Sequence, residues 1–176
     1  MKKIAIFASG SGSNAENIVR YFRISGTAEI AFILTNNPEA YVLQRARKLG
    51  VASHVCPRSE FVEGGKVDEL LRTAEVDLIV LAGFLLLVPK FITDRYAGRI
   101  INIHPALLPA FGGKGMYGDH VHRAVRESGV TESGITVHHV NEFFDSGDII
   151  FQAKIPVEPQ DTPETIAAKV HGLEYR

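Results

Sequence analysis

Short apolar runs alternate with longer segments of helical periodicity through the first half of the chain. The apolar runs predict strands at residues 3–8, 29–34, 52–55 and 77–81. The segments between them predict helices at residues 14–22, 41–49 and 66–74, the second of which stops at Gly50. Strands that alternate with helices and are apolar on both faces form parallel sheets. We therefore predict an α/β fold: a doubly wound, mostly parallel sheet with helices on both faces.

The second half of the chain has a less regular pattern. It predicts strands at residues 99–103, 135–140 and 149–155, and a helix at 119–127 that follows the glycine-rich loop 112–115. A last helix begins with Thr162 as N-cap and Pro163 at the first position. Its apolar stripe consists of Ile166, Val170 and Leu173. Because a loop at residues 141–148 joins the last two strands, we expect mixed strands in this half.

Composition indicates a single globular domain, which we expect to cover residues 1–176. Lys and Arg number 19 against 20 Asp and Glu, so no basic surface suggests nucleic acid or an anionic membrane as a partner. Cys56 is the only cysteine, which excludes an intrachain disulfide. The apolar run after Lys3 is too short for a signal peptide, and none approaches membrane-spanning length. We expect a cytoplasmic protein.

A loop rich in glycine and serine, Ser9-Gly10-Ser11-Gly12-Ser13-Asn14, follows the first predicted strand and opens a helix. Such a loop presents main-chain N–H groups to an anion. A Walker A loop is excluded because no Lys-Ser/Thr pair follows the glycines. A dinucleotide site is nearly matched, but it would need an acidic residue after the second strand, where this chain has Thr35-Asn36-Asn37. We favour a monophosphate or phosphoribosyl site, with a plain helix-capping turn as the alternative.

Asn102 and His104 lie at the end of a predicted strand, two residues apart and hence on one face. An Asn amide can donate to a developing oxyanion, and a His can donate a proton. A carboxylate is needed to orient the His and raise its pKa, and the candidates are Asp145, Asp148 and Glu142. The alternative is a structural His that caps a main-chain carbonyl.

Three segments closely resemble the glycinamide ribonucleotide formyltransferases of the folate-dependent formyltransferase superfamily. They are Leu81-Ala82-Gly83-Phe84, Ile101-Asn102-Ile103-His104-Pro105-Ala106-Leu107-Leu108-Pro109, and the Asp145 loop ahead of Ile149-Ile150. The Asn-Ile-His-Pro run is specific for the superfamily, and the Gly12-Ser13-Asn14 loop narrows the choice to this family. The resemblance covers essentially the whole chain. It implies an enzyme of purine biosynthesis that uses 10-formyltetrahydrofolate as co-substrate and formyl donor.

The resemblance also implies roles for individual residues. Asn102 would stabilise the tetrahedral oxyanion, His104 would protonate the leaving folate nitrogen, and Asp145 would keep the pKa of His104 high. The acceptor would be held by Gly12, Ser13, Asn14, His171, Gly172, Leu173 and Glu174. The folate would contact Leu85, Leu86, Leu87, Val88, Asn102, Asn141, Glu142, Phe143, Phe144 and Asp145. The Leu108–Pro109 peptide bond would be cis.

The sequence departs from the family pattern at two places. The basic ligand contact expected ahead of the third helix is replaced by Glu63-Gly64-Gly65-Lys66, of which only Lys66 is basic. Family members also continue beyond the position of Arg176, so we expect the domain to be shortened at its C-terminus.

Several other functions remain as alternatives. Within the superfamily these are methionyl-tRNA formyltransferase and formyltetrahydrofolate hydrolase, and outside it a non-catalytic dinucleotide-binding module. The first has a second domain and a basic surface, and the hydrolase has a second His where this chain has Pro105. We expect no bound metal, because His120 and His122, like His138 and His139, point to different faces of their elements.

Overall fold

The computed structural model describes residues 1–175, and the chain forms two compact units, Met1–Ile101 and Asn102–Arg176. The expectation of one domain over residues 1–176 stays a prediction. Strand β5 (Ile100–His104) begins in the first unit and ends in the second.

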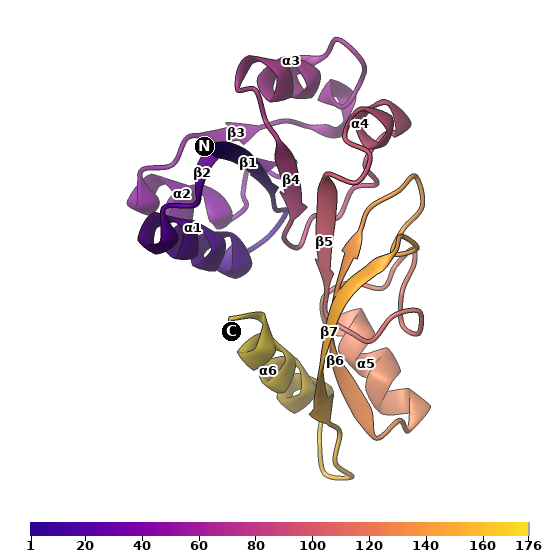
Figure 1. The fold of residues 1–176 in the computed structure, drawn as a ribbon. Helices are drawn as coiled ribbons and strands as arrows, with labels where there is room; N and C mark the ends of the chain where they lie inside the picture. The colour runs from indigo at the N-terminus through magenta and orange to yellow at the C-terminus, as the bar shows by residue number, and fades with distance from the viewer. Residues whose placement is uncertain (176) are drawn as a thin grey trace. The chain divides into compact units, whose positions relative to one another are not determined.

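The first unit is built around parallel strands. Its other elements are β1 (Lys2–Phe7), α1 (Ser13–Ser25), β2 (Ala28–Thr35), α2 (Val42–Leu49), β3 (Ser53–Val55), the 3-10 helix η1 (Arg58–Glu60), α3 (Lys66–Thr73), β4 (Leu78–Leu81) and α4 (Lys90–Arg95). The strand order is β3-β2-β1-β4-β5, and the pairs β1–β2, β1–β4 and β2–β3 are parallel. Helices α1 and α2 lie on one side of these strands and α3 lies on the other (Figure 1).

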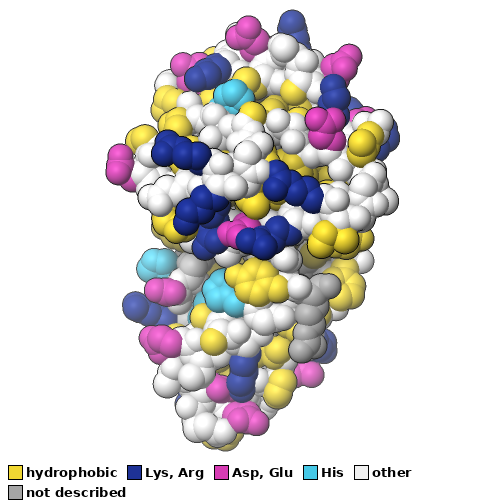
Figure 2. Space-filling model, turned by 90° about the vertical axis from the view of Figure 1, so that its left-hand side faces the viewer, with side chains coloured by type: hydrophobic (Ala, Val, Ile, Leu, Met, Phe, Trp, Pro, Cys, Tyr) yellow, Lys and Arg dark blue, Asp and Glu magenta, His cyan; other side chains and the backbone are white. Residues whose placement is uncertain are grey.

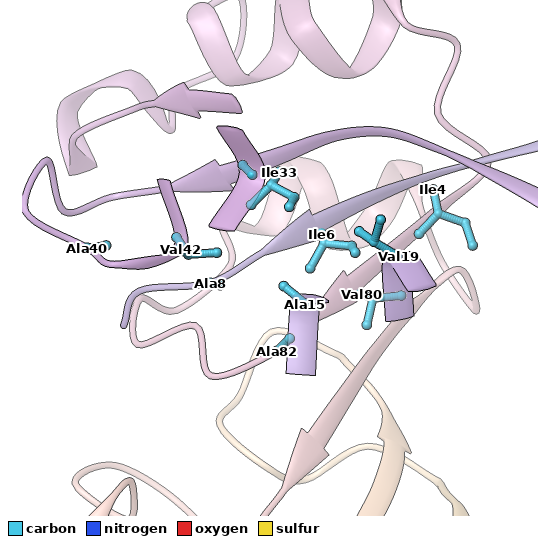
Figure 3. Packing of buried hydrophobic residues seen from close by; sticks show 11 residues of the cluster. Ile4, Ile6, Ala8, Ala15, Val19, Ile33, Ala40, Val42, Val80 and Ala82 are labelled. Carbon is cyan, nitrogen blue, oxygen red and sulfur yellow. The ribbon is translucent and has the colours of Figure 1, made fainter. Parts of the chain in front are cut away.

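One part of the core of the first unit lies between its strands and helix α1. Ile6 of β1, Ile33 of β2 and Val80 of β4 are buried together with Val19 of α1 (Figure 3). Val42, the first residue of α2, belongs to the same cluster. Burial of such side chains from water is the main source of stability here. The core therefore fixes the loop that joins β1 to α1, which carries the predicted phosphate site.

The second unit contains α5 (Asp119–Ser128), β6 (Glu132–His139), β7 (Ile149–Pro156) and α6 (Pro163–Glu174). Its strand order is β5-β6-β7, and β6 and β7 are antiparallel. Its core combines Val121 and Val125 of α5 with Ile166 and Val170 of α6 and with Ile135 of β6. Thr162 caps α6 by accepting a hydrogen bond from the Thr165 main-chain N–H, as its sequence predicts.

The predicted fold class is confirmed, with parallel strands in the first unit and an antiparallel pair in the C-terminal half. The predicted strands and helices are all present, with ends shifted by up to three residues. Helix α4 and the 3-10 helix η1 were not predicted. The Leu108–Pro109 peptide bond is cis, as the family resemblance implies.

Candidate active site

The side chains of Asn102 and His104 both reach the carboxylate of Asp145 in the second unit. Asn102 Nδ2 donates a hydrogen bond to Asp145 Oδ1 at 3.3 Å, and His104 Nδ1 lies 3.5 Å from Asp145 Oδ2. The alternation of side chains along β5 places Asn102 and His104 on one face, as predicted. Among the three carboxylates that the sequence left open, Asp145 is therefore the one that we find paired with His104.

Asp145 lies in the loop between β6 and β7, and its carboxylate is held by a main-chain N–H of the glycine-rich loop that precedes α5. The Gly113 N–H donates to Asp145 Oδ2 at 3.0 Å. Asn141 Oδ1 braces the loop between β6 and β7 by accepting from the Phe143 N–H and from the Ser146 hydroxyl, both at 2.9 Å. Asp145 itself has a φ of 50°, in the left-handed region that residues other than glycine rarely adopt. Such strain is typical of functional sites, where surrounding contacts hold it in place.

His138 is a fourth member of this cluster, and sequence reasoning missed it. Its side chain is only 1% exposed, and its Nε2 lies 3.0 Å from Asn102 Nδ2 and 3.5 Å from Asp145 Oδ1. Its Nδ1 donates to the His139 carbonyl at 2.7 Å, so in the neutral ring Nε2 accepts from Asn102. His138 thereby orients the Asn102 amide. The sequence feature that could have indicated this role is the place of His138 on the predicted strand at 135–140, which pairs with β5.

The pKa of His104 corrects one expectation. The imidazole is buried, at 3% exposure, and its Nε2 donates to the Phe111 carbonyl at 2.7 Å. Burial lowers the pKa of His104, and this effect outweighs the Asp145 carboxylate and the Phe111 carbonyl, which both raise it. The net pKa therefore lies below the ordinary histidine value, whereas the sequence led us to expect a raised one.

The Asp145 carboxyl shows the opposite balance. Burial raises its pKa, but the nearby His138 and His104 rings and the Gly113 N–H together lower it below the ordinary aspartate value. Asp145 therefore stays ionised at neutral pH. A charged carboxylate beside a buried imidazole can stabilise the imidazolium form that proton transfer requires.

Acidification should destabilise the fold because burial depresses the pKa of His104. Below the unfolded-state pKa of about 6.5, His104 binds a proton in the unfolded chain but not in the folded one. The free energy of unfolding therefore decreases as the pH is lowered. Urea unfolding between pH 7.5 and 5.5 should show this loss, and a smaller one for His104→Asn. Burial also lowers the pKa of His54 and His122, so the variant should keep part of the dependence. Equal slopes for both proteins would contradict this account.

The predicted phosphate loop lies in the first unit, at the start of α1. Gly12, the N-cap residue, has a φ of 73° and makes no side-chain cap. The first main-chain N–H groups of a helix have no partner within the helix, so they can bind an anion. Asn14 Oδ1 is buried and has no hydrogen-bond partner among residues 1–175. Because an amide oxygen only accepts, the donors available to a phosphate group here are the main-chain N–H groups at Gly12, Ser13 and Asn14 rather than this Oδ1.

Helix α2 supports the phosphate loop from beside it. The Val42 N–H donates to the Gly10 carbonyl at 3.1 Å, and Arg45 Nε donates to the Ser11 carbonyl at 2.8 Å. The Arg45 guanidinium also pairs with Glu16 of α1. Helices α1 and α2 carry five basic side chains, Arg20, Arg23, Arg45, Arg47 and Lys48, against one acidic side chain, Glu16, and Lys and Arg gather on this face of the molecule (Figure 2). The main-chain N–H groups of the phosphate loop therefore lie beside helices of positive net charge.

The residues expected to contact the folate form two partly exposed apolar segments, one in each unit. In the first, Leu85 is 46% exposed and Leu87 is 45% exposed, whereas Val88 is buried and Leu86 is half-buried. In the second, Phe143 is 65% exposed and Phe144 is 37% exposed. Glu142 is exposed, while Asn141 and Asp145 are half-buried. Exposed apolar side chains that follow a strand end are suited to contact a flat aromatic ligand.

The end of α6 carries the other residues expected at the acceptor. His171 Nδ1 lies 2.8 Å from Glu174 Oε2, and the Glu174 side chain is only 5% exposed. Gly172 is exposed and Leu173 is half-buried against the core of the second unit. His122 of α5 is buried, and its Nδ1 has no partner within residues 1–175. The C-terminal end of α6 therefore holds an exposed imidazole, that of His171, beside the buried carboxylate of Glu174.

Within residues 1–175, no group of three or more His, Cys, Asp or Glu side chains could hold a metal ion. Over the same residues, no helix has the length and apolar character needed to span a membrane.

Comparisons with known proteins show the family to which the chain belongs. The formyl transferase family matches residues 2–176. A phosphoribosylglycinamide formyltransferase of Haemophilus influenzae is 41% identical over all of this chain and 83% of its own length. The chain spans 62% of a chloroplastic enzyme of the same name from Arabidopsis thaliana, at 40% identity.

A solved structure shows the same likeness in three dimensions. Glycinamide ribonucleotide transformylase 1 from Symbiobacterium toebii has a TM-score of 0.90 and 34% identity, over all of this chain and 83% of that one. The resemblance found in the sequence is thereby confirmed, and the chain belongs to the formyl transferase family.

Proposed function

We propose that this protein transfers the formyl group of 10-formyltetrahydrofolate to the amine of glycinamide ribonucleotide, a step of purine biosynthesis. The observation that carries the proposal is the meeting of Asn102 and His104 at the Asp145 carboxylate, in a member of the formyl transferase family. Relatives that match the whole chain bear the name phosphoribosylglycinamide formyltransferase.

The reaction needs no covalent nucleophile. The acceptor amine attacks the formyl carbon, a new C–N bond forms, and the carbonyl oxygen becomes an oxyanion. Asn102 is suited to donate to that oxyanion, exchanging the longer of its two present contacts, the 3.3 Å bond to Asp145. His138 keeps the amide oriented throughout.

Collapse of the tetrahedral intermediate breaks the bond between the formyl carbon and the folate nitrogen. That nitrogen leaves with a proton, for which His104 is the donor, and the amine loses one in turn. Asp145 stabilises the imidazolium form of His104 against the effect of burial.

In the first unit, Gly12, Ser13 and Asn14 would bind the acceptor phosphate, and Leu85 to Val88 would contact the donor. In the second, His171 to Glu174 would contact the acceptor, and Asn141 to Asp145 the donor.

We also propose small-molecule substrates alone as partners, no bound metal, and the cytoplasm as the compartment. Cys56 is buried and is the only cysteine in the sequence, as suits a reducing environment.

Ligand-dependent thermal stabilisation tests the proposal against the alternatives. A ligand that binds only the folded chain stabilises it by RT ln(1 + c/Kd), where c is the free ligand concentration, so the melting temperature rises with ligand concentration. Glycinamide ribonucleotide and 10-formyltetrahydrofolate should each stabilise the protein, and NAD should not. Stabilisation by NAD alone would favour a dinucleotide-binding module and contradict the proposed function.

A further inference from the structure

Three strand ends of the first unit meet at the side chain of Ser9. Ser9 follows β1, and its main-chain N–H donates to the Gly83 carbonyl, after β4, at 2.9 Å. Its hydroxyl oxygen accepts from the Leu85 N–H at 2.9 Å, and the hydroxyl donates to Asn36 Oδ1, after β2. Ser9 is only 6% exposed. Its hydroxyl is therefore a buried junction between segments that are far apart in sequence.

The direction of these hydrogen bonds is fixed by chemistry. A main-chain N–H can only donate, so Leu85 donates to the Ser9 oxygen, and the single hydroxyl hydrogen remains for the Asn36 carbonyl oxygen. Hydrogen bonds linked in this way polarise and strengthen one another. Without the hydroxyl, the Leu85 N–H loses its partner in a part-buried position, which is unfavourable.

The junction links two segments that the proposed function assigns to different ligands. Ser9 stands three residues before Gly12 of the phosphate loop, and it bonds directly to Leu85, the first residue of the segment expected to contact the folate. We propose that Ser9 is a positioning residue for both substrates, fixing the main chain of Leu85 to Val88 and the start of the phosphate loop. This inference rests on the proposed function.

The sheet itself does not depend on the hydroxyl. Main-chain hydrogen bonds from Ala8 to Leu34 at 2.9 Å and from Ser9 to Gly83 at 2.9 Å join the same three strand ends. These bonds survive a change of the Ser9 side chain. Loss of the hydroxyl should therefore leave the fold intact while the segment from Leu85 loses its fixed position.

The test compares Ser9→Ala with Asn36→Ala and with Thr93→Val. Thr93 is also buried, but its hydroxyl donates to the Lys90 carbonyl of its own helix, at 3.0 Å. Ser9→Ala should raise KM for 10-formyltetrahydrofolate about tenfold, raise KM for the acceptor several-fold, and change kcat little. Asn36→Ala keeps the bond from Leu85, so its effect on the donor KM should be smaller. Thr93→Val should leave both KM values unchanged.

Hydrogen exchange at the Leu85 amide adds a readout that does not depend on activity. Exchange should accelerate in Ser9→Ala and stay slow in Thr93→Val, with the rest of the first unit protected as in the wild type. Unchanged exchange, or an unchanged donor KM in an otherwise active Ser9→Ala protein, would overturn the inference and leave the proposed function standing. A wild-type protein that transfers no formyl group would overturn the proposed function, and this inference with it.

Discussion

Replacing His104 or Asp145 with alanine should lower turnover by about 10² or more in each case, as expected for the loss of general acid catalysis. His104 is the only group proposed to protonate the leaving nitrogen, and Asp145 Oδ2 lies 3.5 Å from its Nδ1. Because burial lowers the pKa of His104, the imidazolium depends on that carboxylate. Removal of either partner should therefore remove the proton donor at neutral pH.

The double variant distinguishes a coupled pair from two independent residues. Residues that act as a unit are not additive, so His104→Ala with Asp145→Ala should lose little more than the worse single variant. Asp145→Asn removes the negative charge but keeps an oxygen that can accept from the Gly113 N–H. A loss of turnover in this variant would therefore reflect the missing charge rather than a misplaced loop. Acceptor affinity should stay near the wild-type value in the single variants. Single losses that multiply in the double variant would show that Asp145 acts independently of His104.

A single methyl group at Gly12 should weaken acceptor binding by on the order of tenfold or more while changing donor binding little. A Cβ at Gly12 would lie 2.3 Å from Val42 Cγ2 and 2.5 Å from Val42 Cβ, and the φ of 73° is strained for any other residue. Because Val42 is buried in the core, the loop must move instead. Isothermal titration of Gly12→Ala with each substrate measures the two affinities.

Gly26→Ala is the matched control for Gly12→Ala. Gly26 ends the same helix that Gly12 begins, and its φ of 63° is similar, but a Cβ there meets nothing within 4 Å. The control should lose some stability, roughly 1 kcal/mol, and keep both affinities. If Gly12→Ala lost donor and acceptor affinity equally, the phosphate loop would not be the acceptor-binding site.

The parts of the fold that the sequence predicted are those with a strong local signal. Ile4, Ile6, Ile33 and Val80 are buried because their strands have apolar residues on both faces, and this is what the alternation with helices indicated. Thr162 and Pro163 started α6 as expected, because capping is a property of adjacent residues. The choice of Asp145 over its neighbours required the family resemblance.

Other features depend on contacts that sequence patterns do not contain. Strand β6 begins at Glu132, three residues earlier than predicted, and Gly134 lies in the part that the prediction left out. Glycine weakens a strand pattern, but here it is needed because the Ala153 carbonyl oxygen would lie only 1.9 Å from a Cβ at this position. Helix α4 is only six residues long, too short for a periodic pattern. His138 was considered only as a metal ligand, and its contact with Asn102 follows from strand pairing. The lowered pKa of His104 follows from burial, which is a tertiary property.

The most direct test of the central claim follows the formyl group itself. The purified protein is incubated with glycinamide ribonucleotide and with 10-formyltetrahydrofolate labelled isotopically at the formyl carbon, and the products are identified by mass spectrometry. The account predicts that the label appears on the acceptor amine, with tetrahydrofolate released in equal amount. It also predicts that His104→Ala lowers the rate of this transfer by about 10² or more. Labelled formate with unmodified acceptor would indicate a hydrolase and would contradict the account.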